Sequence, residues 1–151
     1  YSVSENGVYQ FNNTDIQVLK DSFINGHQYA AIADSSYRIY SGMRFLRQDG
    51  STKNIYFYNS DSTMEYMEIP GEPAMGQTWK YFNLSKNVTN LSASIKTNYC
   101  NYSGLLEISD FDGVTLKAKR YYKKGLGLIY SVYPDGVNEG RVFSISKVRL
   151  K

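Results

Sequence analysis

The chain has 151 residues, of which 42% are hydrophobic and 21% are charged. This balance is typical of a folded domain with a sizeable core and excludes a disordered chain, while no apolar run approaches the roughly 18 residues that a membrane-spanning helix needs. The net charge of +3 is too small for the footprint of a nucleic-acid-binding protein, so we predict no nucleic-acid partner.

The chain reads as short β runs separated by turn residues, without a stretch that repeats at the period of an amphipathic helix. Asn25-Gly26 between apolar flanks is the strongest short-range hairpin signal, and Pro70 and Pro73 interrupt a ladder because proline lacks the donor that a central strand requires. In chain order the predicted strands cover residues 7–11, 23–29 around the Asn-Gly turn, 37–40, 43–48, 54–58, 63–69, 78–84, 88–99, 103–109, 114–119, 126–133 and 142–150.

These runs predict a single all-β domain over residues 1–151, with about ten strands in antiparallel sheets that form a sandwich or a curved, open barrel. The 15 tyrosines suit such half-buried strands, because the ring packs while the hydroxyl reaches water. The residues expected to form the core are Trp79, the inward face of Val114, Leu116 and Ala118, and the face shared by Leu126, Leu128 and Tyr130, where Gly125 and Gly127 permit a bulge or a close backbone approach.

The sequence offers no convincing catalytic or metal-binding group, so we predict a protein that is not an enzyme and carries no cofactor or metal. His27, the only histidine, follows the Asn-Gly turn, where an exposed polar residue needs no further reason. Glu65 and Glu68 are three apart in a strand and should face opposite sides. Cys100 is the only cysteine, which excludes a disulfide within the chain and is typical of a small buried hydrophobe.

The two halves of the chain differ in charge. Residues 1–76 carry nine acids and five bases, whereas residues 77–151 carry five acids and twelve bases, five of them within residues 117–124. Alternation places three of these bases and one tyrosine on one strand face, a candidate site for an anionic glycan or an acidic partner: Lys117, Lys119, Tyr121 and Lys123. The alternative is that acids from the first half, such as Glu65 or Glu68, neutralise them within the fold.

Arg120 lies out of phase with that basic face. It must therefore lie at the end of the sheet, extend to water or pair with a buried acid.

Four tyrosines are candidates either to stack on sugars, peptides or bases or to cover cross-strand neighbours: Tyr56, Tyr58, Tyr121 and Tyr133. Five Asn-x-Ser/Thr tripeptides, which begin at Asn12, Asn83, Asn87, Asn90 and Asn101, are interpreted as turn chemistry.

Several segments together resemble a bacterial family. The motifs are Ile-Asn-Gly-His-Gln-Tyr at 24–29, Phe-Leu-Arg-Gln-Asp at 45–49 with Asn-Ile-Tyr at 54–56, Gly-Gln-Thr-Trp at 76–79, and Arg-Tyr-Tyr-Lys-Lys-Gly-Leu-Gly-Leu-Ile at 120–129. They are similar to the uncharacterised exported and lipoprotein β domains of the cell envelope that are common in Bacteroidota. Gln77 stands where that family usually has Asp, and Leu126 where it usually has Val.

The resemblance implies an exported protein, periplasmic or on the cell surface, that touches the membrane only through a possible N-terminal lipid anchor. The start at Tyr1 leads us to expect a processed or trimmed chain. The predicted function is a non-catalytic envelope or secreted domain that binds or scaffolds, with a glycan or another envelope protein as its partner. The alternatives are a carrier of lipid or another apolar ligand in a curved-sheet cavity and an enzyme of unfamiliar type.

Overall fold

A computed structural model describes residues 2–3, 9–10, 16–34, 44–96, 101–134 and 141–144. Every regular element in these residues is a β-strand, and the strands make up more than half of the chain. The predicted all-β, antiparallel fold is therefore confirmed. The chain divides into two compact units, Ser4–Glu72 and Tyr1–Val3 with Pro73–Lys151, and whether they form the single predicted domain stays a prediction.

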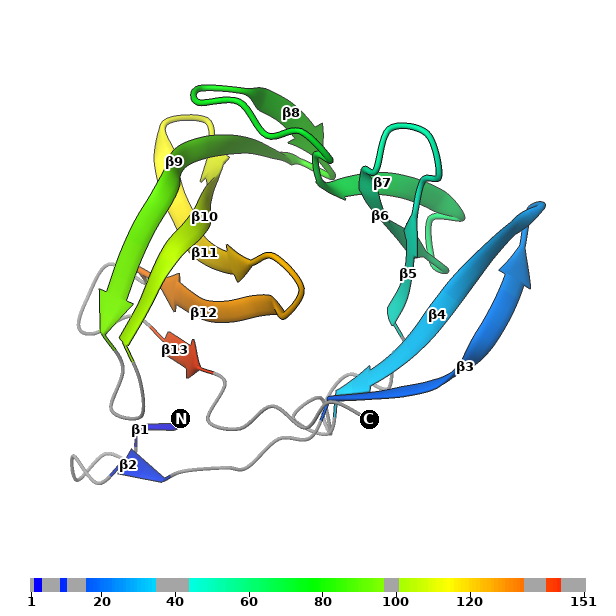
Figure 1. The fold of residues 1–151 in the computed structure, drawn as a ribbon, viewed down its shortest axis with the longest axis horizontal. Helices are drawn as coiled ribbons and strands as arrows, with labels where there is room; N and C mark the ends of the chain where they lie inside the picture. Colours follow the sequence, from blue (N-terminus) through cyan, green and yellow to red (C-terminus); the bar gives the residue numbers. More distant parts are fainter. Residues whose placement is uncertain are drawn as a thin grey trace. The chain divides into compact units, whose positions relative to one another are not determined.

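The unit Ser4–Glu72 is built on a five-stranded meander (Figure 1). Its strands pair in chain order: β3 (Ile16–Ile24), β4 (His27–Asp34), β5 (Arg44–Gln48), β6 (Ile55–Asn59) and β7 (Met64–Ile69). The predicted Asn25-Gly26 hairpin joins β3 to β4, with φ of 50° and 82° at the two residues. Positive φ at both positions gives the turn a twist that matches the strands.

The loop between β5 and β6 is held by Asp49, whose carboxylate accepts hydrogen bonds from the Ser51 and Thr52 N–H groups at 3.0 and 2.8 Å. These bonds lower the pKa of Asp49, with the Thr52 N–H as the largest cause. Gly71 packs against the same loop, since a Cβ there would lie 2.1 Å from the Thr52 carbonyl oxygen. The loop thus accepts only glycine at that position.

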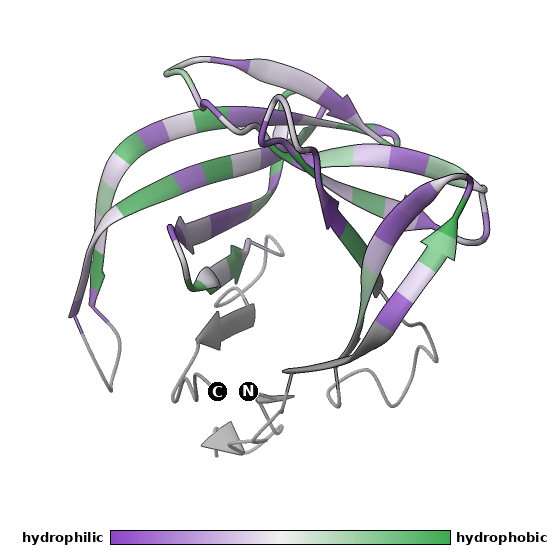
Figure 2. Cartoon of the chain, turned by 45° about the vertical axis from the view of Figure 1, so that its right-hand side comes forward, coloured by the Kyte–Doolittle hydropathy of each residue, from purple (hydrophilic) through white to green (hydrophobic). Residues whose placement is uncertain are grey.

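The second unit is built on a six-stranded antiparallel sheet whose strands also pair in chain order. These are β8 (Thr78–Tyr81), β9 (Leu84–Lys96), β10 (Asn101–Asp112), β11 (Thr115–Lys123), β12 (Gly127–Tyr133) and β13 (Arg141–Ser144). The two longest, β9 and β10, curve together (Figure 1), and apolar and polar residues alternate along both (Figure 2). Two-residue strands, β1 (Ser2–Val3) and β2 (Tyr9–Gln10), lie outside these sheets. Neither sheet closes on itself.

Three sets of predicted core positions and one predicted strand need correction. Val114 is 97% exposed, because it lies with Gly113 in the two-residue turn between β10 and β11 rather than in the strand. Trp79 is only partly buried. The single strand expected over 78–84 is wrong, because a turn at Phe82 and Asn83, with φ of 55° at Phe82, divides it into β8 and the start of β9.

The third correction concerns the strand after Gly125. Leu126 is 39% exposed, because its N–H closes a turn on the Lys123 carbonyl before β12 begins. A bulge in the β11–β12 pairing lets Ile129, at 1% exposure, enter the core instead of Leu128. Gly125 and Gly127 have φ of 81° and 84°, and a Cβ at either would meet nothing within 4 Å. The glycines therefore serve the turn, not a close approach.

The buried cluster of the sheet consists of Ala93, Leu105 and Ile129. No helix in the described residues is long and apolar enough to cross a membrane. The predictions for residues 37–40, Cys100 and 145–150 lie outside the described residues.

Candidate functional site

The predicted basic face lies on β11, and two of its lysines form ion pairs with β10. Lys119 Nζ is 3.3 Å from Glu107 Oε1, and Lys117 Nζ is 3.8 Å from Asp112 Oδ2. The acids come from the neighbouring strand, not from the first half of the chain as the alternative stated. The positive charge of these two lysines is thus balanced locally, so they are weak candidates for ligand contact.

Glu107 joins Tyr121 to the same network. Burial raises the pKa of the Tyr121 phenol to about 12, helped by the charge of Glu107 and by a hydrogen bond to it. Burial also acts to raise the pKa of Glu107, but hydrogen bonds from Thr89 and Tyr121 and the charge of Lys119 outweigh it and lower that pKa. The Thr89 hydroxyl donates to Glu107 Oε1 at 2.7 Å. This network fixes the side chain of Tyr121 on the sheet.

Tyr121 belongs to a group of three tyrosines that pack against the buried cluster. Tyr102 of β10, Tyr121 of β11 and Tyr130 of β12 all contact it while remaining partly exposed. The rings of Tyr121 and Tyr130 are 5.9 Å apart and inclined at 55°. The alternation of side chains along β11 predicts the position of Tyr121 alone. That Tyr102 and Tyr130 lie on the same cluster as Tyr121 depends on packing between strands.

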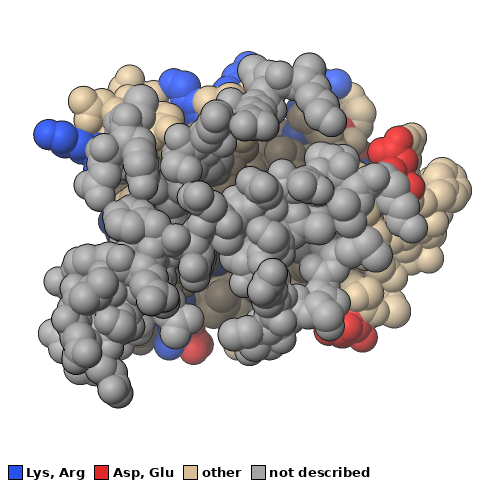
Figure 3. Space-filling model, turned by 90° about the horizontal axis from the view of Figure 1, so that it is seen from below, with Lys and Arg blue, Asp and Glu red and all other residues tan. Residues whose placement is uncertain are grey.

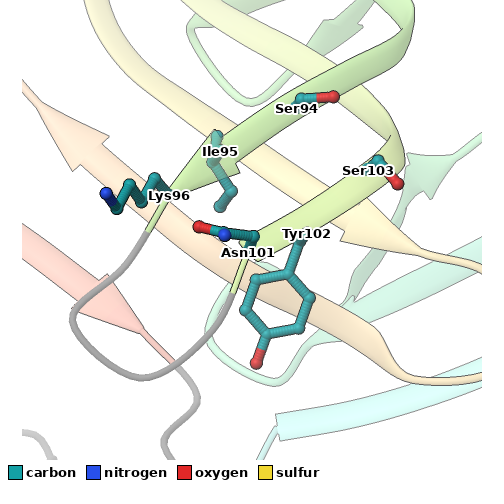
Figure 4. Close-up of a pocket in the computed structure, with 6 residues that line it drawn as sticks. All are labelled: Ser94, Ile95, Lys96, Asn101, Tyr102 and Ser103. Atoms are coloured by element: carbon teal, nitrogen blue, oxygen red, sulfur yellow. The ribbon is translucent and has the colours of Figure 1, made fainter.

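A groove of about 370 Å³, lined by one of these rings, Tyr102, lies where the paired strands β9 and β10 end and begin (Figure 4). Ile95 and Tyr102 are cross-strand partners there. The groove is lined by Ser94, Ile95, Lys96, Asn101, Tyr102 and Ser103. The lining of the groove thus combines one partly buried phenol ring with hydroxyl, amide and ammonium groups.

Lys123, the fourth predicted residue, borders this groove. Its Nζ donates to the Ser103 carbonyl oxygen at 2.6 Å. Within the described part of the chain, neither Lys123 nor Lys96 lies within ion-pair distance of a carboxylate. Their charge is therefore not balanced there, in contrast to that of Lys117 and Lys119. We refer to Tyr102, Tyr121 and Tyr130 as the tyrosine face.

Arg120 forms an ion pair with Asp110 of β10, which is 1% exposed. Of the three placements expected for Arg120, pairing with a buried acid is therefore confirmed. Its guanidinium carbon also lies 5.7 Å from the centre of the Tyr133 ring. On the same sheet, Lys86 is completely buried, with its ammonium 4.0 Å from the centre of the Tyr81 ring. Tyr133 therefore has a contact within the fold, as the packing alternative expected.

The tyrosines of the five-stranded sheet are likewise engaged in packing. Arg47 binds Glu65 through Nε and Nη2 at 2.5 and 2.6 Å, and the Tyr29 hydroxyl donates to Glu65 at 2.6 Å. Tyr56 lies 4.6 Å from the Arg47 guanidinium carbon, and Tyr58 lies 5.7 Å from Tyr29. Since these rings cover cross-strand neighbours, they are poor candidates for sugar stacking.

No group of three His, Cys, Asp or Glu side chains in the described residues is arranged to hold a metal ion. His27 is exposed beside its turn.

No protein-family model, curated protein or solved structure matches this chain. The resemblance to bacterial envelope domains therefore stays a prediction.

Proposed function

We propose that this chain is a non-catalytic glycan-binding domain whose ligands carry acidic groups. The observation that supports it is the groove of about 370 Å³, whose lining combines the Tyr102 ring with serine hydroxyls, the Asn101 amide and the Lys96 ammonium. A sugar ring has an apolar face that packs on an aromatic ring and hydroxyls at its edge that need hydrogen-bond partners. The groove supplies both.

The preference for acidic sugars comes from the two unbalanced lysines. Lys96 lines the groove and Lys123 borders it. An ammonium without a neighbouring carboxylate is free to pair with that of a uronic acid or with a sulfate group. The binding site therefore keeps Tyr121 and Lys123 from the predicted set, adds Lys96 and Tyr102, and assigns Lys117 and Lys119 to the fold.

The apolar-ligand carrier and the enzyme have less support. Val114, which was expected to line a carrier's cavity, is exposed, and the groove has four polar residues among its six. A glycan-binding role suits an exported protein of the cell surface or periplasm, which is the location that the resemblance implies. Another envelope protein is the remaining partner class.

The proposal is tested by calorimetry with a panel of galacturonate and sulfated oligosaccharides. Tyr102→Ala should weaken binding about fivefold, because an aromatic contact contributes roughly 1 kcal/mol. Asn101→Ala, an exposed position, should also weaken it without disturbing the core. Tyr102→Phe should retain most of the affinity, since it keeps the ring.

The matched control is Leu91→Ala, on the same strand β9 but outside the groove and 46% exposed. It should bind as the unaltered protein does. Unchanged affinity in both Tyr102→Ala and Asn101→Ala, or an equal loss in Leu91→Ala, would overturn the proposal. Thermal unfolding of each variant checks that the fold is intact.

A further inference from the structure

A second groove, of about 390 Å³, lies at the opposite end of β9 from the first. It is formed where the β8–β9 hairpin meets the turn between β10 and β11. Its lining includes Trp79 and Lys80 of β8, Asn83 of the turn, Leu84 and Ser85 of β9, and Gly113. Trp79 is partly buried, while Lys80, Asn83 and Ser85 are exposed. We refer to it as the Trp79 groove.

The Trp79 groove repeats the chemistry of the Tyr102 groove. Each contains one partly buried aromatic ring, one branched aliphatic side chain, one exposed lysine and exposed hydroxyl groups. Each also contains an Asn-x-Ser tripeptide, Asn83-Leu84-Ser85 in one and Asn101-Tyr102-Ser103 in the other. The side chains that we propose to recognise an acidic sugar in the first groove therefore have counterparts in the second.

The two grooves are held on one sheet. Leu84 begins β9 and Lys96 ends it, a length of about 40 Å at roughly 3.3 Å per residue, shortened by the curvature of the strand (Figure 1). Pairing with β10 extends along β9 from Ser85 to Lys96, so the separation of the grooves is fixed. Two sites of fixed separation suit a polymer better than a small ligand, because binding at the second site is then intramolecular.

We propose that the Trp79 groove is a second binding site for acidic glycans, so that one polymer chain is held at both ends of β9. This inference rests on the proposed function of the Tyr102 groove. The protein contains a single tryptophan, so its fluorescence reports on the Trp79 groove alone.

The experiment titrates the full chain with tetragalacturonate and with polygalacturonate, and follows both tryptophan emission and heat. In Tyr102→Ala, tetragalacturonate should still change the emission, because the second groove is intact. In Lys80→Ala combined with Asn83→Ala, the emission change should disappear while calorimetry still detects the Tyr102 groove. Lys124→Ala, an exposed lysine outside both grooves, is the matched control and should keep the emission change.

Polygalacturonate should bind the unaltered protein at least about a hundredfold more tightly than either single-groove variant, as expected for two linked sites. One tetragalacturonate per chain with unchanged emission at saturation would overturn the second site but leave the Tyr102 groove standing. The absence of any heat of binding for either galacturonate ligand or for the sulfated panel would overturn both proposals.

Discussion

Buried and exposed ion pairs lie side by side on β10. Asp110 is 1% exposed and pairs with Arg120, whereas the Asp112 side chain, two residues further on, is 57% exposed and lies 3.8 Å from Lys117. Removing one partner of a buried pair leaves the other charge without compensation in a poorly solvated site, while an exposed pair is screened by water. The two aspartates therefore differ in their importance for stability.

We expect Asp110→Asn to lower the free energy of unfolding by about 3 kcal/mol, because it removes the charge that compensates the Arg120 guanidinium. Asp112→Asn, the same substitution on the same strand, should change it by less than about 0.5 kcal/mol. Denaturant unfolding followed by circular dichroism measures both. Equal effects of the two substitutions would contradict this account of the Arg120 pair.

The Glu65 carboxylate links stability to pH. Burial acts to raise its pKa, but the hydrogen bonds from Arg47 and Tyr29 outweigh burial and lower it below the usual value. Because the pKa of Glu65 is lower in the folded than in the unfolded state, the carboxylate stabilises the protein at pH values above its unfolded-state pKa of about 4.3. This contribution is lost as the pH falls through the folded-state pKa.

Glu65→Gln should therefore lose less stability than the unaltered protein between about pH 6 and about pH 3, because it has no proton to bind at this position. The comparison requires denaturant unfolding of both proteins at each pH. Asp21→Asn, at an exposed side chain that accepts a hydrogen bond from Gln28, is the control and should follow the unaltered protein. Parallel pH dependences of all three proteins would exclude Glu65 as a source of acid lability.

At the scale of the elements, the six-stranded sheet is organised around Leu105 of β10. This side chain is completely buried and forms the core cluster with Ala93 of β9 and Ile129 of β12. The three tyrosines of the tyrosine face pack against the same cluster. The core therefore supports both the sheet and the surface that we propose to bind glycans.

We expect Leu105→Ala to cost roughly 2–5 kcal/mol of unfolding free energy, the range for a buried leucine truncated to alanine. Leu126→Ala should cost less than about 0.5 kcal/mol, because that leucine is exposed in the turn before β12. The measurement is again denaturant unfolding. A larger loss for Leu126 than for Leu105 would show that the predicted core face, rather than the observed one, is correct.

At the scale of the whole molecule, charge is divided between the two compact units. Ser4–Glu72 carries nine acids and five bases, whereas Tyr1–Val3 with Pro73–Lys151 carries five acids and twelve bases. Lys and Arg side chains are visible at the molecular surface (Figure 3). Both grooves belong to the basic unit, so its field attracts anionic polymers toward them.

Raising the salt concentration from about 50 to about 200 mM should therefore weaken polygalacturonate binding, by about tenfold if two or three ammonium groups contact the polymer. A neutral polymer such as dextran, if it binds at all, should show no such dependence. Calorimetry at the two concentrations measures the effect. Polygalacturonate affinity that does not change with salt would contradict a role for Lys96, Lys123 and Lys80 in binding.

Most of the local structure could be predicted from the sequence, because its signals lie within a few residues of chain. The Asn25-Gly26 turn and the antiparallel all-β class follow from turn residues and short β runs. Alternation along the strand also predicted that Arg120 points away from the basic face and needs a partner or access to water. The strand predicted over 78–84 missed the break at Phe82, because no glycine or proline marks it, although the Asn83 tripeptide was interpreted as turn chemistry.

The candidate site could be predicted only in part. Tyr121 and Lys123 follow from the period of one strand, but Tyr102 and Lys96 join them only through the pairing of β9 with β10, and Ile129 replaces Leu128 in the core through a bulge. Register and bulges depend on interactions between residues far apart in the chain, which a local pattern does not encode. The sequence by itself therefore determined the all-β class, most of the strands, the Asn25-Gly26 turn and the basic face, while the tertiary structure decided which lysines are neutralised and where the grooves lie.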